Sequence, residues 1–214
     1  MAELRQNAGT TRPRKTSGPK LNNKRIYGAI LKAKIIINMI SCMIFKTKSP
    51  KETQKIAADI ARKIVKSKPQ KHACVFALEG ELGAGKTTFI QGFAKALKIK
   101  QKITSPTFVL MRHYKLRTGN PEKASGVKPR GGHATLRGPL GFTGWKLLIH
   151  IDAFRLKNWH DLISLGIKDI FANPENIVLI EWAERVRPIL PQKRTRIHID
   201  HLEKNARKIT ITEK

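Results

Sequence analysis

One segment of the sequence combines glycines, a lysine and a threonine at a spacing that suits phosphate binding. Residues 80–87 read GELGAGKT and fit the pattern G-x-x-x-x-G-K-[ST]. Glycines let successive backbone N–H groups approach phosphate oxygens, and a following helix adds positive potential at its N-terminus. We expect Lys86 to reach the β- and γ-phosphates and the Thr87 hydroxyl to ligate Mg²⁺. The predicted ligands are ATP and one magnesium ion, and the predicted contacts are Gly80, Glu81, Leu82, Gly83, Ala84, Gly85, Lys86, Thr87 and Thr88.

Two carboxylates stand at the ends of strand-like runs. Asp152 ends the run 147–152, and Glu181 ends the run 177–181. Ligands of open α/β sheets bind at the carboxyl ends of the strands, and a nucleotide site needs a carboxylate near its magnesium ion. For either residue alone a structural salt bridge is an equally good interpretation. The presence of both in a chain with a phosphate loop favours a function for them.

Three other residue sets could take part in chemistry. Ser105 and Thr107 lie in the segment SPTF after the phosphate loop, where nucleotide switches place a hydroxyl, although such a segment also opens strands. Trp182 follows Glu181 and could be a stacking platform, a partner anchor or the edge of the core. The seven histidines show no metal-ligand spacing with cysteine or carboxylate, so no zinc site is expected.

The elements that must position these residues alternate between strands and helices. A buried strand is predicted at 73–78, directly before the phosphate loop, and an amphipathic helix at 86–97 directly after it. Ser49, Pro50 and Glu52 have the order of a helix start. The other predicted elements are a short strand at 44–46, strands at 108–116, 147–152 and 177–181, a helix at 159–171, and strands at 194–200 and 208–212. The pattern predicts an α/β fold: a single P-loop NTPase domain with a mixed, mostly parallel sheet flanked by helices and a C-terminal β-hairpin.

The charge of the chain is strongly positive and unevenly placed. Its 214 residues include 43 Lys and Arg and 15 Asp and Glu, for a formal net charge of +28. Residues 1–48 hold 11 of the basic residues with 1 acidic one, and residues 115–146 hold 7 with 1. Such a surface attracts polyanions in a salt-dependent way. Binding of RNA through these segments and simple solvation of them both remain open.

Two segments are expected to lie outside the folded core. Residues 1–42 predict a basic, disordered extension, unless translation starts at Met39 or Met43. The stretch 118–144 is rich in glycine and breaks all periodicity, which predicts a loop insertion in a domain that spans 43–214. Two cysteines and no apolar run near 20 residues indicate a reduced, cytoplasmic protein without a membrane span.

Several motifs together resemble one known family. GELGAGKTTF, SPTF, HIDAFRL, LGIKDIF and IVLIEWAERV occur in the order found in the TsaE (YjeE) family of bacterial ATPases. That family supports threonylcarbamoyladenosine modification of tRNA. The resemblance covers about residues 43–213, apart from 118–144, and the motifs are specific because they are independent and ordered.

The resemblance implies roles for individual residues. It implies Lys86, Asp152 and Glu181 as catalytic residues, with Thr87 and Glu181 at the magnesium ion. Ser105 and Thr107 match a switch-like segment, and Thr53 matches a threonine near the adenine. The implied partners are TsaB and TsaD, with tRNA contacted indirectly or through the basic segments; DNA is not expected.

The sequence also departs from the family pattern. Ala183 replaces a proline, Ala153 and Phe154 replace Leu-Tyr, and the basic insertion is unexpected. The substitutions spare the ionisable residues, whereas the insertion bears on partner geometry. The predicted function is a Mg²⁺-dependent ATPase, slow without its partners. The alternatives are a small-molecule kinase with Asp152 as base, and a nucleotide-switched RNA-binding module.

Overall fold

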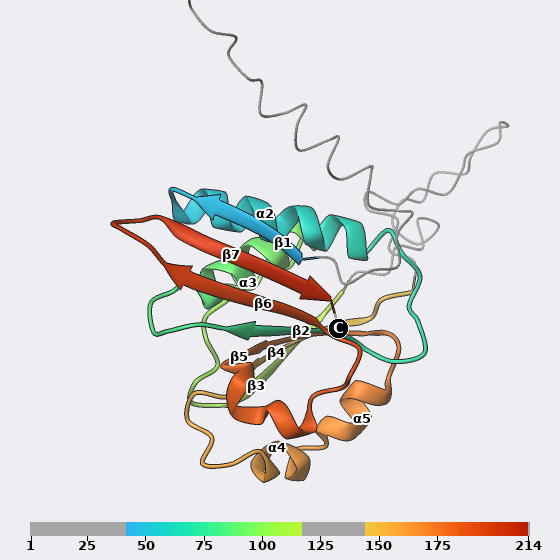
Figure 1. Ribbon diagram of the computed structural model, residues 1–214. Helices are drawn as coiled ribbons and strands as arrows, with labels where there is room; N and C mark the ends of the chain where they lie inside the picture. The colour runs from blue at the N-terminus through green and yellow to red at the C-terminus, as the bar shows by residue number, and fades with distance from the viewer. Residues whose placement is uncertain (1–41, 117–143, 214) are drawn as a thin grey trace, which may run out of the picture. The chain divides into compact units, whose positions relative to one another are not determined.

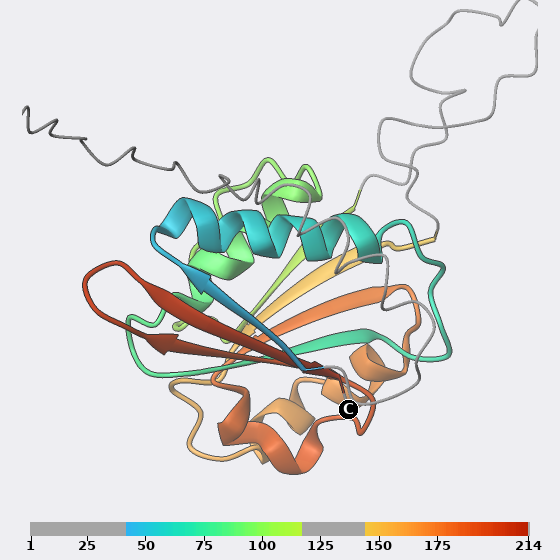
Figure 2. The ribbon, with the colours of Figure 1, turned by 45° about the horizontal axis from the view of Figure 1, so that its top comes forward.

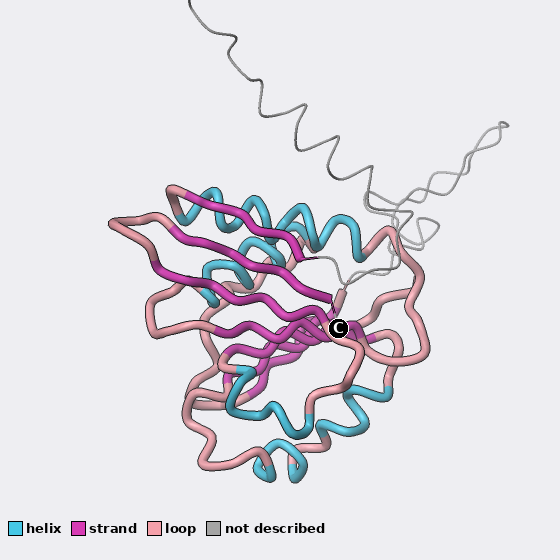
Figure 3. Tube along the Cα trace, in the orientation of Figure 1, coloured by secondary structure: helices cyan, strands magenta, loops and turns pink. Residues whose placement is uncertain are grey.

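Apolar runs bounded by glycine, proline and polar residues become strands, and amphipathic runs become helices. The computed structural model describes residues 42–116 and 144–213. Figure 1 shows these elements, and Figure 3 shows the loops that join them. In chain order they are β1 (Cys42–Thr47), α2 (Pro50–Ile64), β2 (Cys74–Glu79), α3 (Lys86–Ala96), β3 (Met111–Lys115), β4 (Leu147–Asp152), α4 (His160–Ser164), α5 (Ile167–Ala172), β5 (Asn176–Glu181), the 3₁₀ helix η2 (Ala183–Ile189), β6 (Thr195–His201) and β7 (Arg207–Glu213).

The described strands form one seven-stranded sheet in the order β1-β7-β6-β2-β5-β4-β3. Its four middle strands, β6, β2, β5 and β4, are parallel, and the pairings towards both edges are antiparallel. The mixed α/β sheet and the C-terminal hairpin of β6 and β7 confirm the predicted fold class. The strand before the phosphate loop, β2, therefore lies in the middle of the sheet, with β5 and then β4 on one side.

Helices cover both faces of this sheet, as Figures 1 and 2 show. Helices α2 and α3 cover one face, over a core that includes Phe76, Phe89 and Phe93. Helices α4 and α5 and the 3₁₀ helix η2 cover the other face, over a core that includes Ile151 and Ile180. Because both faces are covered, β2 and β5 are buried along almost their whole length, as expected for parallel strands.

The start of α2 follows the predicted capping pattern. The Ser49 side chain accepts a hydrogen bond from the Glu52 backbone N–H, and Pro50 occupies the first turn. The Glu52 carboxylate in turn accepts from the Lys48 N–H at 2.8 Å. The helix ends at Ile64, five residues before Pro69, the proline that the sequence pattern predicts to end it.

Two predicted elements differ from the observed ones. The predicted strand 108–116 begins only at Met111, because Phe108 and Val109 lie in a turn and are 81% and 56% exposed. The predicted helix 159–171 is two helices, since Gly166 adopts a left-handed φ of 75° between α4 and α5. The sequence reasoning did not predict η2.

Two predicted segments lie largely outside the described residues. The extension 1–42 does so except for Cys42, which begins β1, and the insertion 118–144 does so except for Gly144. In the described part of the chain, no helix has the length and apolar character that crossing a membrane requires.

Candidate functional site

The phosphate-loop sequence forms the turn between β2 and α3. Gly80, Gly83 and Gly85 all adopt positive φ angles, of 135°, 77° and 106°. At Gly80 a Cβ atom would stand 2.3 Å from the Ile199 carbonyl oxygen of the neighbouring strand β6. Only glycine fits at position 80, and the positive φ angles at Gly83 and Gly85 favour glycine there, so the path of the loop itself accounts for the motif's glycines. The loop leads directly into the N-terminus of α3.

Lys86 folds back onto this loop. Its Nζ donates hydrogen bonds to the carbonyl oxygens of Gly80 and Glu81 at 2.6 and 2.8 Å, and it lies 3.6 Å from the centroid of the Trp182 ring. Burial lowers the pKa of Lys86 below its ordinary value, and the negative charges of Glu181, Glu184 and Asp152 only partly oppose that shift. The negative charge of a phosphate beside this amine would favour its protonated form and so offset the effect of burial.

The Thr87 hydroxyl meets the first of the two predicted carboxylates. Its Oγ1 lies 2.9 Å from both Oε1 and Oε2 of Glu181 and donates to that carboxylate. Glu181 ends β5, only 3% of its surface is exposed, and its Oε1 lies 2.8 Å from Nε2 of His150. The sheet order explains this meeting, because β5 is the direct neighbour of the strand that precedes the phosphate loop.

The second carboxylate, Asp152, holds the SPT segment. Its Oδ2 accepts hydrogen bonds from the hydroxyls of Ser105 and Thr107, the latter at 2.6 Å, and its Oδ1 accepts from the Phe154 backbone N–H at 2.9 Å. The two hydroxyls are also 2.7 Å apart. Asp152 pairs in register with Glu181 on the adjacent strand. The residues predicted from the ends of two strands and from the SPT segment therefore lie along one edge of the sheet.

Trp182 contacts Lys86 and Phe154 and has a strained backbone conformation. Its φ of 57° and ψ of 42° are left-handed, which is uncommon for a bulky residue and is found where surrounding structure fixes the backbone. Its ring packs on Phe154 with centroids 4.9 Å apart and on the Lys86 amine. Trp182 also packs partly against the core below η2. The side chain thus serves both the core edge and the phosphate-loop lysine.

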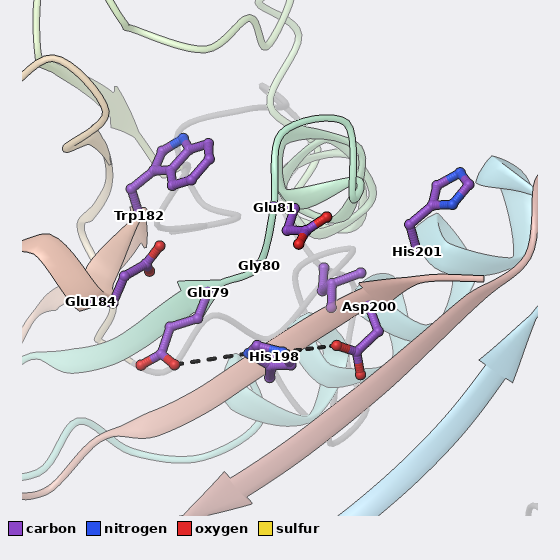
Figure 4. A pocket seen from close by; sticks show the side chains of 9 residues that line it. Glu79, Gly80, Glu81, Trp182, Glu184, His198, Asp200 and His201 are labelled. Carbon is purple, nitrogen blue, oxygen red and sulfur yellow. Dashed lines mark hydrogen bonds and ion pairs between the residues drawn. The ribbon is translucent and has the colours of Figure 1, made fainter.

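A pocket of about 400 Å³ opens on the β6 side of the loop. Figure 4 shows its lining, with Glu79 and His198 between Trp182 and Asp200. Burial favours the neutral form of Glu79, but the hydrogen bond and charge of Arg196, aided by Arg187 and His198, lower its pKa below the ordinary value. The Arg196 Nε lies 2.7 Å from Glu79 Oε2. Glu79 therefore already has a cationic partner inside the protein.

The remaining predicted residues have simpler surroundings. Within the phosphate loop, Leu82 is 79% exposed, whereas Ala84 is fully buried. Thr88 follows in the first turn of α3 and is partly buried. Thr53 is 1% exposed, and its hydroxyl lies 3.0 Å from that of Thr47, so it is engaged inside the fold. The part of Thr53 in adenine binding remains a prediction.

Sequence reasoning missed two residues that contact the site. Metal-ligand spacing does not distinguish His150 from the other histidines, although its place two residues before Asp152 on a strand puts both on one face. Arg207 comes from β7, far away in sequence, and donates through Nε to the Ala84 carbonyl at 2.8 Å. No local pattern signals that contact, because it depends on how the terminal hairpin joins the sheet.

The oxygen groups of the site suit magnesium bound together with a nucleotide. Thr87 supplies a hydroxyl and Glu181 a carboxylate, and both are hard oxygen donors of the kind that Mg²⁺ prefers. Mg²⁺ is commonly held by one or two such groups together with substrate phosphates and water. The loop that would present those phosphates adjoins both side chains. The donor set therefore fits the predicted ion.

Comparisons with known proteins show which family this chain is similar to. The family model for "Threonylcarbamoyl adenosine biosynthesis protein TsaE" matches residues 47–124 and 137–209. The chain is 33% identical over 168 residues to the tRNA threonylcarbamoyladenosine biosynthesis protein TsaE of Bacillus subtilis, covering 78% of this chain and 84% of the relative. The protein of the same name from Aquifex aeolicus is 31% identical over 170 residues, covering 78% and 92%. The crystal structure of Bacillus subtilis YdiB matches with a TM-score of 0.55 at 29% identity, covering 83% of this chain and 88% of that one.

Proposed function

Because this chain belongs to the TsaE family of threonylcarbamoyl adenosine biosynthesis proteins, we propose that it binds ATP with Mg²⁺ and hydrolyses the nucleotide. Its relatives act in tRNA threonylcarbamoyladenosine biosynthesis, and this chain shares that role. In this pathway it would be the nucleotide-driven component rather than the transferase. The same relatives disfavour the alternatives of a small-molecule kinase and a separate RNA-binding switch.

The contact between Thr87 and Glu181 is the observation that carries this proposal. A phosphate loop alone is compatible with many activities, but here its hydroxyl is hydrogen-bonded at 2.9 Å to a buried carboxylate from the neighbouring strand. P-loop ATPases hold Mg²⁺ with this pair of groups, a loop hydroxyl and a carboxylate at a strand end. The hydrogen bond holds both groups next to each other beside the phosphate loop.

The chain's own residues would divide the work as follows. The glycine loop and the N-terminus of α3 would bind the phosphates. The Lys86 amine, which donates to the carbonyls of Gly80 and Glu81, would donate to the phosphate oxygens instead. Thr87 and Glu181 would hold Mg²⁺, which neutralises charge on the phosphate oxygens. Asp152 would keep Ser105 and Thr107 beside the terminal phosphate, where a switch segment can respond to it.

The surface around the loop suits association with other proteins. Leu82, Phe108 and Val109 are large apolar side chains that are 79%, 81% and 56% exposed. Two of them belong to the turn that Asp152 holds, so their position depends on the site. Exposed apolar side chains beside a functional site can take part in partner contacts. We infer that TsaB and TsaD complete the site here, in the cytoplasm, and that turnover is slow without them.

Nucleotide binding and turnover with matched variants test the proposal. The full chain is titrated with ATP in Mg²⁺ and in excess EDTA, and turnover is measured with and without TsaB, TsaD and tRNA at two salt concentrations. We expect Lys86→Ala to weaken ATP binding at least about tenfold, since it loses charge-assisted hydrogen bonds worth roughly 1.5–3 kcal/mol. Glu181→Gln should lose most of the Mg²⁺-dependent affinity and the partner-stimulated turnover.

Two surface variants control for changes of charge. Lys95→Ala removes an exposed lysine from the last turn of the same helix, and Glu203→Gln removes an exposed carboxylate from the turn of the terminal hairpin. Both should behave as the unmodified chain. If Lys86→Ala and Glu181→Gln also keep full binding and partner-stimulated turnover, the chain does not work as a magnesium-dependent ATPase.

A further inference from the structure

We propose that His150 is a positioning residue that fixes the orientation of the Glu181 carboxylate for magnesium binding, an inference that rests on the proposed function. His150 Nε2 lies 2.8 Å from Glu181 Oε1, and neither side chain is more than 4% exposed. The contact is therefore a direct hydrogen bond shielded from solvent, rather than a chance approach at the surface.

Strand alternation places the two side chains on the same face of the sheet. Leu148 and Leu179 both pack in the core under α2 and α3, and side chains two residues apart on a strand share a face. His150 therefore projects towards α3 from β4, as Glu181 does from β5. Thr87 lies in the first turn of that helix, so all three groups converge at one point.

The contacts of the Glu181 carboxylate determine which ring nitrogen carries a proton. An ionised carboxylate only accepts hydrogen bonds, so His150 must donate through Nε2–H. The other ring nitrogen, Nδ1, is buried and has no hydrogen-bond partner among the described residues. An unpartnered buried nitrogen costs stability, so packing alone would be better served by an apolar residue. The ring is retained here for its one donor, which faces the carboxylate.

This donor matters most when the Thr87 hydroxyl changes partner. In the described structure Thr87 and His150 both donate to Glu181. A hydroxyl that ligates Mg²⁺ turns a lone pair to the ion, and its hydrogen bond to the carboxylate then changes. The bond from His150 does not involve the ion's ligands on the loop, so it keeps Oε1 in place. Groups that orient metal-binding side chains in this way typically contribute 10–100-fold to metal affinity.

Three substitutions separate donation from packing. Glutamine places its amide nitrogen as many bonds from Cα as Nε2 of histidine, so His150→Gln keeps a donor near Glu181. Asparagine reaches only as far as Nδ1, and leucine has no donor, so His150→Asn and His150→Leu both lose the contact. His113→Gln, at an exposed position on the adjacent strand β3, controls for loss of a histidine.

Calorimetric titration of the full chain with a non-hydrolysable ATP analogue, in Mg²⁺ and in excess EDTA, tests the inference. We expect the gain in affinity from Mg²⁺ to fall about tenfold or more in His150→Leu and His150→Asn, and to stay within about threefold of the unmodified chain in His150→Gln. Affinity in EDTA should be unchanged in all of them. If the unmodified chain shows no Mg²⁺-dependent affinity, the proposed function itself fails. If only the variants depart from expectation, the role of His150 alone fails.

Two other results would overturn the role of His150 alone. One is a gain in affinity from Mg²⁺ that His150→Leu keeps in full, or that His150→Gln loses as completely as His150→Leu does. The other is an equal loss of affinity with and without Mg²⁺, which is the behaviour of a purely structural residue. Nitrogen chemical shifts of the His150 ring in the unmodified chain give a measurement that needs no variant to fold. They should report Nε2–H, and a ring protonated only at Nδ1 contradicts the inference.

Discussion

Replacement of Asp152 by asparagine tests how the SPT segment is held. The carboxylate accepts three hydrogen bonds, from the Ser105 and Thr107 hydroxyls at Oδ2 and from the Phe154 N–H at Oδ1, and Asp152 is 2% exposed. Asparagine has nearly the same shape but only one accepting oxygen. If that oxygen faces Phe154, the amide nitrogen faces the two hydroxyls, which can rotate and accept instead.

The expected cost follows from this rearrangement. Hydrogen bonds to a charged group contribute roughly 1.5–3 kcal/mol each and neutral ones roughly 0.5–1.5 kcal/mol. Since the partners of Asp152→Asn can be satisfied again, we expect a loss of about 1–3 kcal/mol in the free energy of unfolding. Asp152→Ala leaves all three donors without their acceptor and should cost more, about 3–5 kcal/mol. The order of the two variants is therefore part of the prediction.

Urea denaturation of the two variants and of a double-mutant cycle with Thr107→Val measures these costs. The cycle should give a coupling energy of about 1 kcal/mol between Asp152 and Thr107, because they are in direct contact. Asp59→Asn, which changes an exposed carboxylate paired with Arg62 on α2, should lie within about 0.5 kcal/mol of the unmodified chain. If Asp152→Asn is equally neutral, or the coupling is zero, Asp152 does not hold the segment.

Two further predictions concern the loop and its pocket. Gly80→Ala should lower the free energy of unfolding by about 2 kcal/mol or more, because φ is 135° and the new Cβ would stand 2.3 Å from the Ile199 carbonyl oxygen. Gly83→Ala has open space around it and should cost only about 1 kcal/mol, for its left-handed backbone. Equal losses for the two variants in urea denaturation would contradict the predicted clash at Gly80. The folded-state pKa of Glu79 lies below its ordinary 4.5, so its contribution to stability is fully present above that value and is lost as the pH falls through the lower folded pKa. Glu79→Gln should flatten this acid limb of the stability profile, and an unchanged profile in denaturation curves below pH 5 would contradict it.

Part of the site follows from sequence because local rules determine it. The phosphate loop joins a buried strand to a helix, and the ends of parallel strands meet at one edge, so Thr87, Asp152 and Glu181 could be expected to approach one another. The order of the strands sets which carboxylate meets the loop. Because β5 rather than β4 adjoins β2, Glu181 contacts Thr87 and Asp152 contacts the SPT segment instead. Periodicity carries no information on that order.

The errors have an equally physical origin. Phe108 and Val109 have the β propensity of a strand, but the hydrogen bonds of Thr107 to Asp152 and of Val109 to Pro106 hold them in a turn. Tertiary contacts of this kind override local propensity. Gly166 ends α4 within a run of helical period because it takes a left-handed conformation. Neither contact nor conformation can be read from the spacing of apolar residues.

The buried carboxylates near the loop fall into two kinds by the charge of their partners. Glu79 is paired with Arg196, so its charge is largely balanced within the protein. In the described residues Asp152 and Glu181 are held instead by hydroxyls, a backbone N–H and a histidine, and neither forms an ion pair with lysine or arginine. Hydrogen bonds orient these two carboxylates, and Lys86, whose pKa their charges influence, donates to the carbonyl oxygens of Gly80 and Glu81 rather than to them. These two carboxylates can therefore respond to a cation that binds at the loop, Glu181 directly and Asp152 through the SPT segment that it holds. We infer that Asp152 and Glu181, and not Glu79, are kept for the magnesium nucleotide.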